Sequence, residues 1–356
     1  MAISIVGGII FGIIGFIGAR QFLTWMDSPP NVIGKATLYM RICFIGVPAN
    51  IVYNFGSSIL RATGDTQRPL IILSSTGVIN VLLNLLLVIV FKMDVAGVAI
   101  ATITAQYLSA VAVVFILIRS DDWIRLSVSK IGIDRQSIMR IARMGIPSGV
   151  QGSMFSISNV IIQSAVNSFP TPLIAGNTIA ANLGGFTYTV MNSFFHATLA
   201  FTGQSFGARK YRRVNRVLLI GVIQVTVFGL AMGLGELALG EQLAGLYNKE
   251  PEVIAAAIYR MSMLLPTYFI CGIMEIFAGS LRGMGCSLVP MISSVFGACI
   301  IRSWWTIVVF GAFGTPFSLY ISYPISWLVT LILHIITLIV VKKRQSRLQG
   351  SLESGC

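Results

Sequence analysis

The sequence is built from long apolar runs separated by short charged or turn-rich segments. An α-helix needs about 20 mostly apolar residues to cross the hydrocarbon core of a bilayer, and ten runs reach or approach that length. The chain is 55% apolar and 10% charged, whereas soluble domains carry roughly 25% charged residues. We therefore predict an all-α integral membrane protein with about ten transmembrane helices. The predicted spans are Ala2–Ala19, Leu38–Leu60, Leu70–Phe91, Val95–Ile118, Met144–Phe169, Leu173–Phe206, Val217–Leu234, Val253–Ser280, Cys286–Phe310 and Phe317–Val341.

The first run, Ala2–Ala19, is interpreted as a membrane span rather than as a signal peptide. It lacks both a basic start and a small-residue cleavage site. Its glycines, Gly8, Gly12, Gly15 and Gly18, suit close packing against another helix instead.

The basic residues divide unequally between the two sides of the predicted membrane. Of 25 Lys and Arg residues, 18 fall in loops on one side, 4 on the other side and 3 inside spans. Basic residues concentrate in cytoplasmic loops, so we predict a multi-pass protein of the cell membrane with both termini in the cytoplasm. The same rule explains the surplus of 25 basic over 12 acidic residues, and no nucleic-acid partner is predicted.

Two turn-rich segments repeat one pattern. LRATGDTQRP (Leu60–Pro69) and LRGMGCSLVP (Leu281–Pro290) share a Leu-Arg, a Gly and a Pro at the same spacing. Both join an incoming span to an outgoing one on the cytoplasmic side, and Tyr39 and Tyr259 lie near the outer ends of the spans before them. We predict an internal duplication whose halves are related by an axis along the membrane normal, which is a transporter architecture.

The two predicted halves are unequal, because four spans precede a charged segment and six follow it. We predict an incomplete N-terminal lobe (1–118), a cytoplasmic linker (119–143), a C-terminal lobe (144–342) and a basic cytoplasmic tail (343–356). Relative to a symmetric parent, the chain is expected to lack about two helices, or roughly 80 to 100 residues. We therefore expect poor folding or no transport unless an upstream segment is supplied.

Glu275 is the one acidic residue of twelve that the predicted spans place well inside the membrane. A charge at the bilayer centre costs about 2.5–3.5 kcal/mol on insertion scales, so such a group is usually paired or functional. Arg302, on the next span, is the obvious partner, but counting helical rise from the cytoplasmic ends leaves the two residues about 13 Å apart in depth. We interpret Glu275 as a cation-binding carboxylate, with a structural ion pair to Arg302 as the alternative.

Other polar residues in the spans are candidates for lining a cavity. The sixth predicted span is long enough to contain a break at Gly184–Gly185, and its asparagines either hydrogen-bond between helices or line the cavity. Arg260 lies near an outer helix end, where we expect it to anchor the helix at the interface. The cavity candidates are Arg302, Asn177, Asn182, Asn192, Tyr39 and Tyr259.

Several stretches resemble one transporter family. GQSFGARK, LRATGDTQRPL, GVINVLLNLLLV and MDVAGVAIAT resemble the multidrug and toxic compound extrusion (MATE) transporters, and AGNTIAANLGGFTYTVMNSF and EIFAGSLRGMG are similar to their MepA-type branch. The resemblance covers nearly the whole chain, from the third family helix to the twelfth. It implies a twelve-helix, two-lobe parent that exports organic cations or drugs in exchange for Na⁺ or H⁺. It implies no cofactor beyond the coupling ion, a cationic or amphiphilic small-molecule substrate, a lipid bilayer around the protein, and a monomer.

The resemblance also implies site residues in the N-terminal half. Asn80 and Asn84 match the cation-site pattern Asn-x-x-x-Asp/Asn of the family's fifth helix, and Thr102 matches the small-Thr motif of the next helix. The family's coupling Asp belongs to the first helix, which lies in the segment expected to be missing. Some members carry a Glu in the seventh helix, but the corresponding region here, 154–159, has no carboxylate. These departures leave the choice between Na⁺ and H⁺ open.

Other classes of function fit the sequence less well. An enzyme is not predicted, because the chain has no HExxH or GxSxG motif. His196 and His334 lack metal-ligand spacing, so core packing and no metal site are expected. A flippase for a lipid-linked oligosaccharide or a related amphiphile shares the broad architecture and is the alternative function. It would need a cationic cavity for a pyrophosphate head group, which Arg302 and Arg260 could supply.

Overall fold

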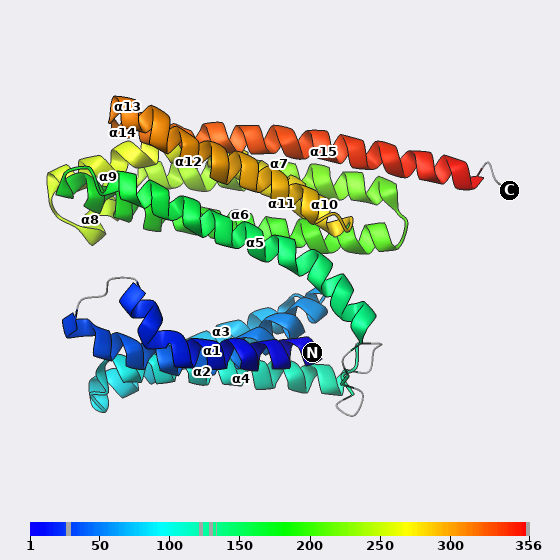
Figure 1. Cartoon of the computed structure of the whole chain (residues 1–356), viewed down its shortest axis with the longest axis horizontal. Coiled ribbons are helices and arrows are strands. Elements are labelled where there is room, and N and C mark those ends of the chain that lie inside the picture. Colours follow the sequence, from blue (N-terminus) through cyan, green and yellow to red (C-terminus); the bar gives the residue numbers. More distant parts are fainter. Residues whose placement is uncertain (26–29, 121–123, 128–130, 133, 354–356) are drawn as a thin grey trace. The chain divides into compact units, whose positions relative to one another are not determined.

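A computed structural model describes residues 1–25, 30–120, 124–127, 131, 132 and 134–353, and this described part is helical without any β-strand (Figure 1). The helices form two compact units, Met1–Met139 and Arg140–Cys356. The boundary between the units falls within the segment 119–143 that the sequence indicates as a linker, of which residues 121–123, 128–130 and 133 lie outside the described part.

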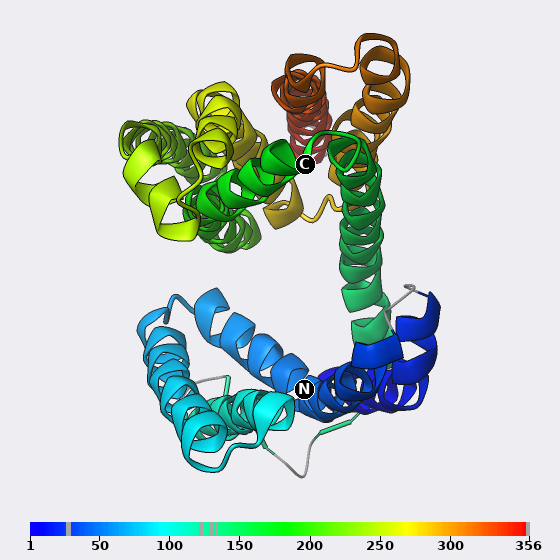
Figure 2. The same cartoon turned by 90° about the vertical axis from the view of Figure 1, so that its left-hand side faces the viewer.

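The first unit contains four long helices, seen roughly along their axes in Figure 2 (blue to cyan). Glycines allow the first two to approach closely: an added Cβ at Gly8 would lie 2.7 Å from Pro48 Cα, and one at Gly12 would lie 3.0 Å from Phe44 O. Gly18 instead faces Phe22 of its own helix. The elements are α1 (Ala2–Trp25), α2 (Pro30–Ala62), α3 (Gln67–Leu85), its π-helical continuation η1 (Leu86–Val90) and α4 (Asp94–Arg119).

The second unit contains the remaining helices. Its core includes a cluster of Met191, Val225, Met274, Ile276 and Trp327. The elements are α5 (Arg135–Val166), α6 (Thr171–Gly207), α7 (Tyr211–Ala238), α8 (Gly240–Tyr247), α9 (Pro251–Leu264), η3 (Leu265–Thr267), α10 (Tyr268–Gly283), α11 (Leu288–Ser294), η4 (Val295–Ile301), α12 (Arg302–Trp305), η5 (Thr306–Phe310), α13 (Gly311–Phe313), α14 (Pro316–Tyr320) and α15 (Ser322–Glu353). Because α15 continues to Glu353, the predicted start of the tail at residue 343 is not a break in the helix.

Eight helices of the described part are long and apolar enough to cross a membrane: Ala2–Trp25, Val32–Ala62, Gln67–Val90, Asp94–Arg119, Tyr211–Ala238, Pro251–Gly283, Leu288–Phe313 and Pro316–Lys343. The helices α5 and α6 contain 32 and 37 residues but do not reach that apolar content. All ten predicted spans coincide with helix over most of their length, so the predicted all-α membrane fold is confirmed.

Two details of the spans differ from the sequence-based expectation. The predicted break at Gly184–Gly185 is wrong, because α6 is continuous from Thr171 to Gly207. A break occurs instead in a later span, at Pro266, where the 3₁₀ turn η3 separates α9 from α10. Proline has no backbone N–H, so the carbonyl of Ser262 loses its usual intrahelical donor there. The interrupted helix Pro251–Gly283 still forms one membrane-crossing element, with Tyr268 near its middle.

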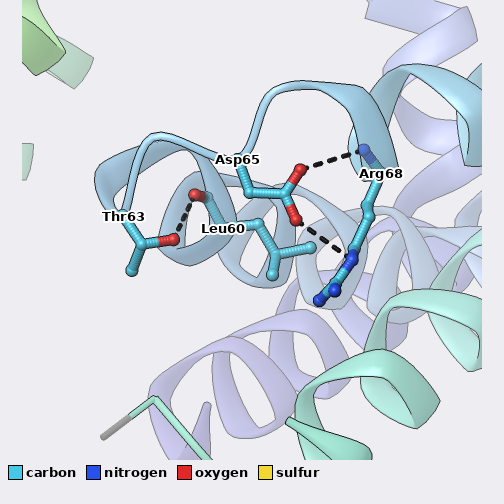
Figure 3. Close-up of polar contacts among 4 residues, drawn as sticks. All are labelled: Leu60, Thr63, Asp65 and Arg68. Atoms are coloured by element: carbon cyan, nitrogen blue, oxygen red, sulfur yellow. Dashed lines mark hydrogen bonds and ion pairs between the residues drawn. The ribbon is translucent and has the colours of Figure 1, made fainter. Parts of the chain in front are cut away.

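The two repeated segments fold into the same turn, of which Figure 3 shows the first copy. The N–H of Asp65 donates to Leu60 O at 3.1 Å, and the N–H of Cys286 donates to Leu281 O at 3.0 Å. In both copies a glycine in the left-handed region closes the helix, with φ of +95° at Gly64 and +85° at Gly285. Together with bonds to Arg61 O and Arg282 O, these contacts form a Schellman motif in each copy.

Only the first copy adds side-chain contacts within the turn. Asp65 accepts a hydrogen bond from the backbone N–H of Arg68 at 3.1 Å and pairs with its Nε at 3.2 Å (Figure 3). Thr63 Oγ1 donates to Leu60 O at 2.7 Å (Figure 3). The second copy has Cys286 where the first has Asp65, so the repeat preserves the backbone turn rather than its charges.

Candidate functional site

Glu275 lies on α10, partly buried within the second unit. No ion pair between described residues involves its carboxylate. The possible ion pair with Arg302 is therefore absent, in agreement with the difference in depth calculated from helical rise.

Arg302 is satisfied by a different set of groups. Its side chain is buried, with 4% exposure. Nε and Nη2 donate to Ser326 Oγ at 2.9 and 2.6 Å, and the guanidinium lies 4.4 Å from the centre of the Tyr323 ring and 5.8 Å from that of Trp327. These contacts join α12 to α15. The arginine thus holds two helices together by hydrogen bonds and cation–π contacts.

Tyr268, Glu275 and Arg282 are seven residues apart along α10. Seven residues are close to two helical turns, so the three side chains share one face of the helix. Glu275 interacts electrostatically with Arg282 on its own helix and with Tyr188 on α6. We call this face, with Tyr188 and Asn192 of α6, the polar stripe of the second unit.

Two glycines bring α6 and α10 together along the polar stripe. An added Cβ at Gly184 would lie 2.7 Å from Tyr268 Oη, and one at Gly279 would lie 3.0 Å from Phe195 O. Because neither glycine carries a side chain, the helices can approach closely enough for polar groups on both to meet.

Arg282 occupies the end of the polar stripe nearest the C-terminus of α10. It was missed as a site residue, because its place in the repeated turn suggested an ordinary loop charge. Its Nη2 donates to Gln151 Oε1 on α5 at 2.7 Å, and its guanidinium lies 5.5 Å from the centre of the Phe195 ring. Its Nε is buried without a hydrogen-bond partner among the described residues. Arg282 therefore places a positive charge about two turns from Glu275 without a direct bridge.

Glu236 is a second carboxylate within a helix, two residues before the end of α7 at Ala238. The predicted span ended at Leu234, but α7 continues to Ala238 and α8 then packs on α9. Thr187 Oγ1 donates to Glu236 Oε1 at 2.8 Å. The run of Gly and Glu after Leu234 resembles a loop in sequence, which is why helix continuation was not predicted.

Arg260 does not reach the interface as predicted. Its side chain is buried, with 7% exposure, and its Nη1 donates to the backbone oxygen of Asn177 at 2.6 Å. The guanidinium also lies 5.8 Å from the centre of the Tyr320 ring. The predicted anchoring failed because groups of α6 and α14 hold the guanidinium inside the bundle.

The other residues predicted to line a cavity do not gather in one place. Asn177 is buried, Asn192 is partly buried beside Tyr188, and Asn182 is exposed. Tyr39 and Tyr259 are exposed at 36% and 44%. The structure therefore brings Asn192 to Tyr188, which interacts with Glu275, and leaves Asn182, Tyr39 and Tyr259 on the surfaces of their units.

Asn80 and Thr102 line one open pocket of about 210 Å³ in the first unit, between α2, α3 and α4. Asn84, one turn further along α3, donates from Nδ2 to Asn80 Oδ1 at 3.1 Å, while its own Oδ1 is buried without a partner among the described residues. The wall of the cavity also includes Asn50 and Gln106. All of these groups are uncharged, so the cavity offers amide and hydroxyl oxygens rather than a carboxylate.

The fold and these internal polar groups define a multi-pass helical membrane protein of the transporter class, because polar side chains inside spans mark ion and substrate sites. The chain belongs to the MatE family, whose model matches residues 1–86 and 147–306. Members of this family are transporters rather than enzymes, and the resemblance drawn from the sequence is confirmed.

Individual relatives agree with this assignment. The chain is 25% identical over 299 residues to the probable multidrug resistance protein YoeA of Bacillus subtilis, covering 81% of this chain and 64% of that protein. It is 20% identical over 286 residues to the multidrug export protein MepA of Staphylococcus saprophyticus, covering 79% and 63%. The chain thus spans slightly under two thirds of the length of these relatives. The flippase alternative receives no support from the comparisons.

Solved structures share the fold. An outward-facing conformation of a multidrug resistance MATE family transporter of the MOP superfamily matches with a TM-score of 0.88 and 18% identity, over 96% of this chain and 78% of that chain. At this level of identity the match supports the fold alone.

Proposed function

We propose that the protein is a secondary active antiporter of the cell membrane that exports organic cations or drugs in exchange for Na⁺ or H⁺. The observation that carries this proposal is the position of Glu275, a carboxylate inside α10 with no ion pair to a described residue. It shares the polar stripe with Tyr188 and Asn192, which are uncharged, and with Arg282, which interacts with it electrostatically without forming an ion pair. A single anionic group in such a place selects for cations.

Antiport requires that the coupling ion and the substrate exclude each other, so that each favours a different state of the alternating-access cycle. Glu275 provides that exclusion, because its ionised form holds one monovalent cation and its protonated form holds none. The positive charge of Arg282 opposes the binding of a second cation nearby. The uncharged cavity around Asn80, Asn84 and Thr102 is suited to polar contacts with the substrate or with a partly dehydrated ion.

Equilibrium binding tests this proposal most directly, because it does not require a complete transport cycle. The purified chain in detergent should bind tetraphenylphosphonium, and either Na⁺ or acid should displace it. Glu275→Gln should weaken tetraphenylphosphonium binding about tenfold or more, equivalent to roughly 1.4 kcal/mol, and should abolish the displacement. Glu275→Asp should keep part of both properties, because it retains the charge.

Two variants act as controls for Glu275→Gln. Glu252→Gln makes the same change at an exposed position in the first turn of α9 and should leave binding unaltered. Arg302→Ala should affect displacement less than Glu275→Gln, because Arg302 contacts α15 rather than Glu275. Displacement that persists undiminished in a folded Glu275→Gln variant would refute the proposal.

A further inference from the structure

One carboxylate of the second unit has no part in the proposed role of Glu275. Glu236 is satisfied on one side only: Oε1 accepts the hydrogen bond from Thr187, while Oε2 is buried with no hydrogen-bond donor among the described residues. Thr187 itself is fully buried. A buried carboxylate oxygen without a donor is costly, and such an oxygen usually indicates a proton, an ion or a water in the working protein.

Glu236 lies at the level of the break between α9 and α10. An added Cβ at Gly233, three residues earlier on α7, would lie 2.7 Å from the carbonyl oxygen of Leu265 in η3. Tyr268, the first residue of α10, interacts electrostatically with Glu236, and its hydroxyl lies against Gly184, one turn from Thr187 on α6. Three helices therefore bring Thr187, Glu236 and Tyr268 to one place.

The interrupted helix supplies the second feature of an ion site. Discontinuous helices in transporters expose backbone carbonyls that coordinate cations near the middle of the membrane. Tyr268 lies near the middle of Pro251–Gly283, and Pro266 leaves the Ser262 carbonyl without its helical donor. A carboxylate, hydroxyl groups and a freed carbonyl are hard oxygen ligands, which suit small monovalent cations better than transition metals.

We propose that Glu236, with Thr187 and Tyr268, forms a second monovalent-cation site that takes up H⁺ or Na⁺. The site lies at the Tyr268 end of the polar stripe, and Tyr268 is two turns of α10 from Glu275. Its part in transport rests on the proposed antiport function, whereas its occupancy by a cation does not. The second unit then holds up to two cations, one at each carboxylate.

Infrared difference spectroscopy of the purified chain in detergent tests the site without reference to transport. Protonated carboxyl groups give a C=O band that disappears on ionisation. In the wild type this band should contain a component that is lost in Glu236→Gln and retained in Glu275→Gln. Glu241→Gln, the same change at an exposed position on α8 five residues away, should leave the component in place.

The conditions that remove the component distinguish the two cations. Loss on addition of Na⁺ at constant pH identifies a Na⁺ site, and loss only when the pH is raised identifies a proton site. Thr187→Val keeps the shape of the side chain and removes the donor to Oε1, so it should shift the component even if Glu236→Gln does not fold. A spectrum with no component that responds to Glu236→Gln or to Thr187→Val would overturn the proposal. This outcome is independent of whether Na⁺ or acid displaces tetraphenylphosphonium through Glu275.

Discussion

Arg282 and Gln151 join α10 to α5 through a hydrogen bond of 2.7 Å from Nη2 to Oε1. The bond fixes a guanidinium on the same helix face as Glu275, and it leaves the Nε of Arg282 without a partner among the described residues. Gln151 is itself buried, with 7% exposure, so its side chain cannot readily replace this bond with one to bulk water.

We expect Gln151→Leu to destabilise the protein, because it leaves a partly buried charged donor unpaired. Hydrogen bonds to charged groups contribute about 1.5–3 kcal/mol, and the loss should fall near that range. A double-mutant cycle with Arg282→Leu, read by denaturant unfolding in micelles, should give a coupling energy of about 0.5–3 kcal/mol. Additive effects of the two changes would contradict a direct interaction. Arg61→Leu, at the equivalent position of the first repeat, should show no coupling to Gln151.

The glycines of the two repeated turns should not tolerate a side chain. Gly64→Ala and Gly285→Ala would each place a Cβ on a residue in the left-handed region, which costs about 1–2 kcal/mol. Thermal unfolding should therefore show a lower midpoint for both variants. Gly152→Ala is the control, since Gly152 is exposed in α5 with open space around it, and that change should be neutral or stabilising. Equal midpoints of thermal unfolding for the three variants would contradict the turn geometry.

Two adjacent glycines of α1 provide a matched test of its packing. A methyl group at Gly8 would lie 2.7 Å from Pro48 Cα, whereas one at Gly7 would meet nothing within 4 Å. We expect Gly8→Ala to destabilise the α1–α2 contact by about 1–3 kcal/mol through overpacking, and Gly7→Ala to be neutral or slightly stabilising. In detergent, the first unit of the Gly7→Ala variant should resist protease as well as that of the wild type, and the first unit of Gly8→Ala should resist it less well. The reverse order would exclude the packing of α1 on α2 described above.

The orientation in the membrane can be tested at the last two spans. Reporters fused after Gly311 and after Lys343 bracket the span Pro316–Lys343. The loop charges predict that the reporter after Lys343 is cytoplasmic and that the reporter after Gly311 is on the opposite side. Reporters that are active in the same compartment would show that the predicted topology is wrong.

Much of the fold was predictable because hydropathy and helical rise are local properties of the chain. The ten helical runs, the repeated turn and the separation of Glu275 from Arg302 followed from run length, spacing and 1.5 Å of rise per residue. The same counting failed where a helix continued beyond its apolar run. For Glu236 and Arg260, contacts with neighbouring helices rather than sequence hydropathy decide how deeply each side chain is buried: Thr187 of α6 bonds Glu236, and Asn177 of α6 bonds Arg260.

The partners of charged residues were the least predictable part of the site. Arg282 has the sequence context of a loop arginine, and only the folded chain places Gln151, 131 residues away, against it. Asn182 and Asn192 look alike in sequence, yet one is exposed and the other is beside Tyr188. Such differences depend on how the helices are rotated about their own axes. Apolar content does not determine that rotation when most of the helix surface is apolar.

The repeated turn has a consequence for how the two halves can change over evolutionary time. Six residues before the turn, the first copy carries Asn54 and the second carries Glu275. The backbone bonds that close both turns involve neither side chain, so a substitution there changes charge without changing shape. Selection can therefore add or remove a carboxylate in one copy while the other keeps its own chemistry, and a duplicated scaffold becomes a source of functional asymmetry.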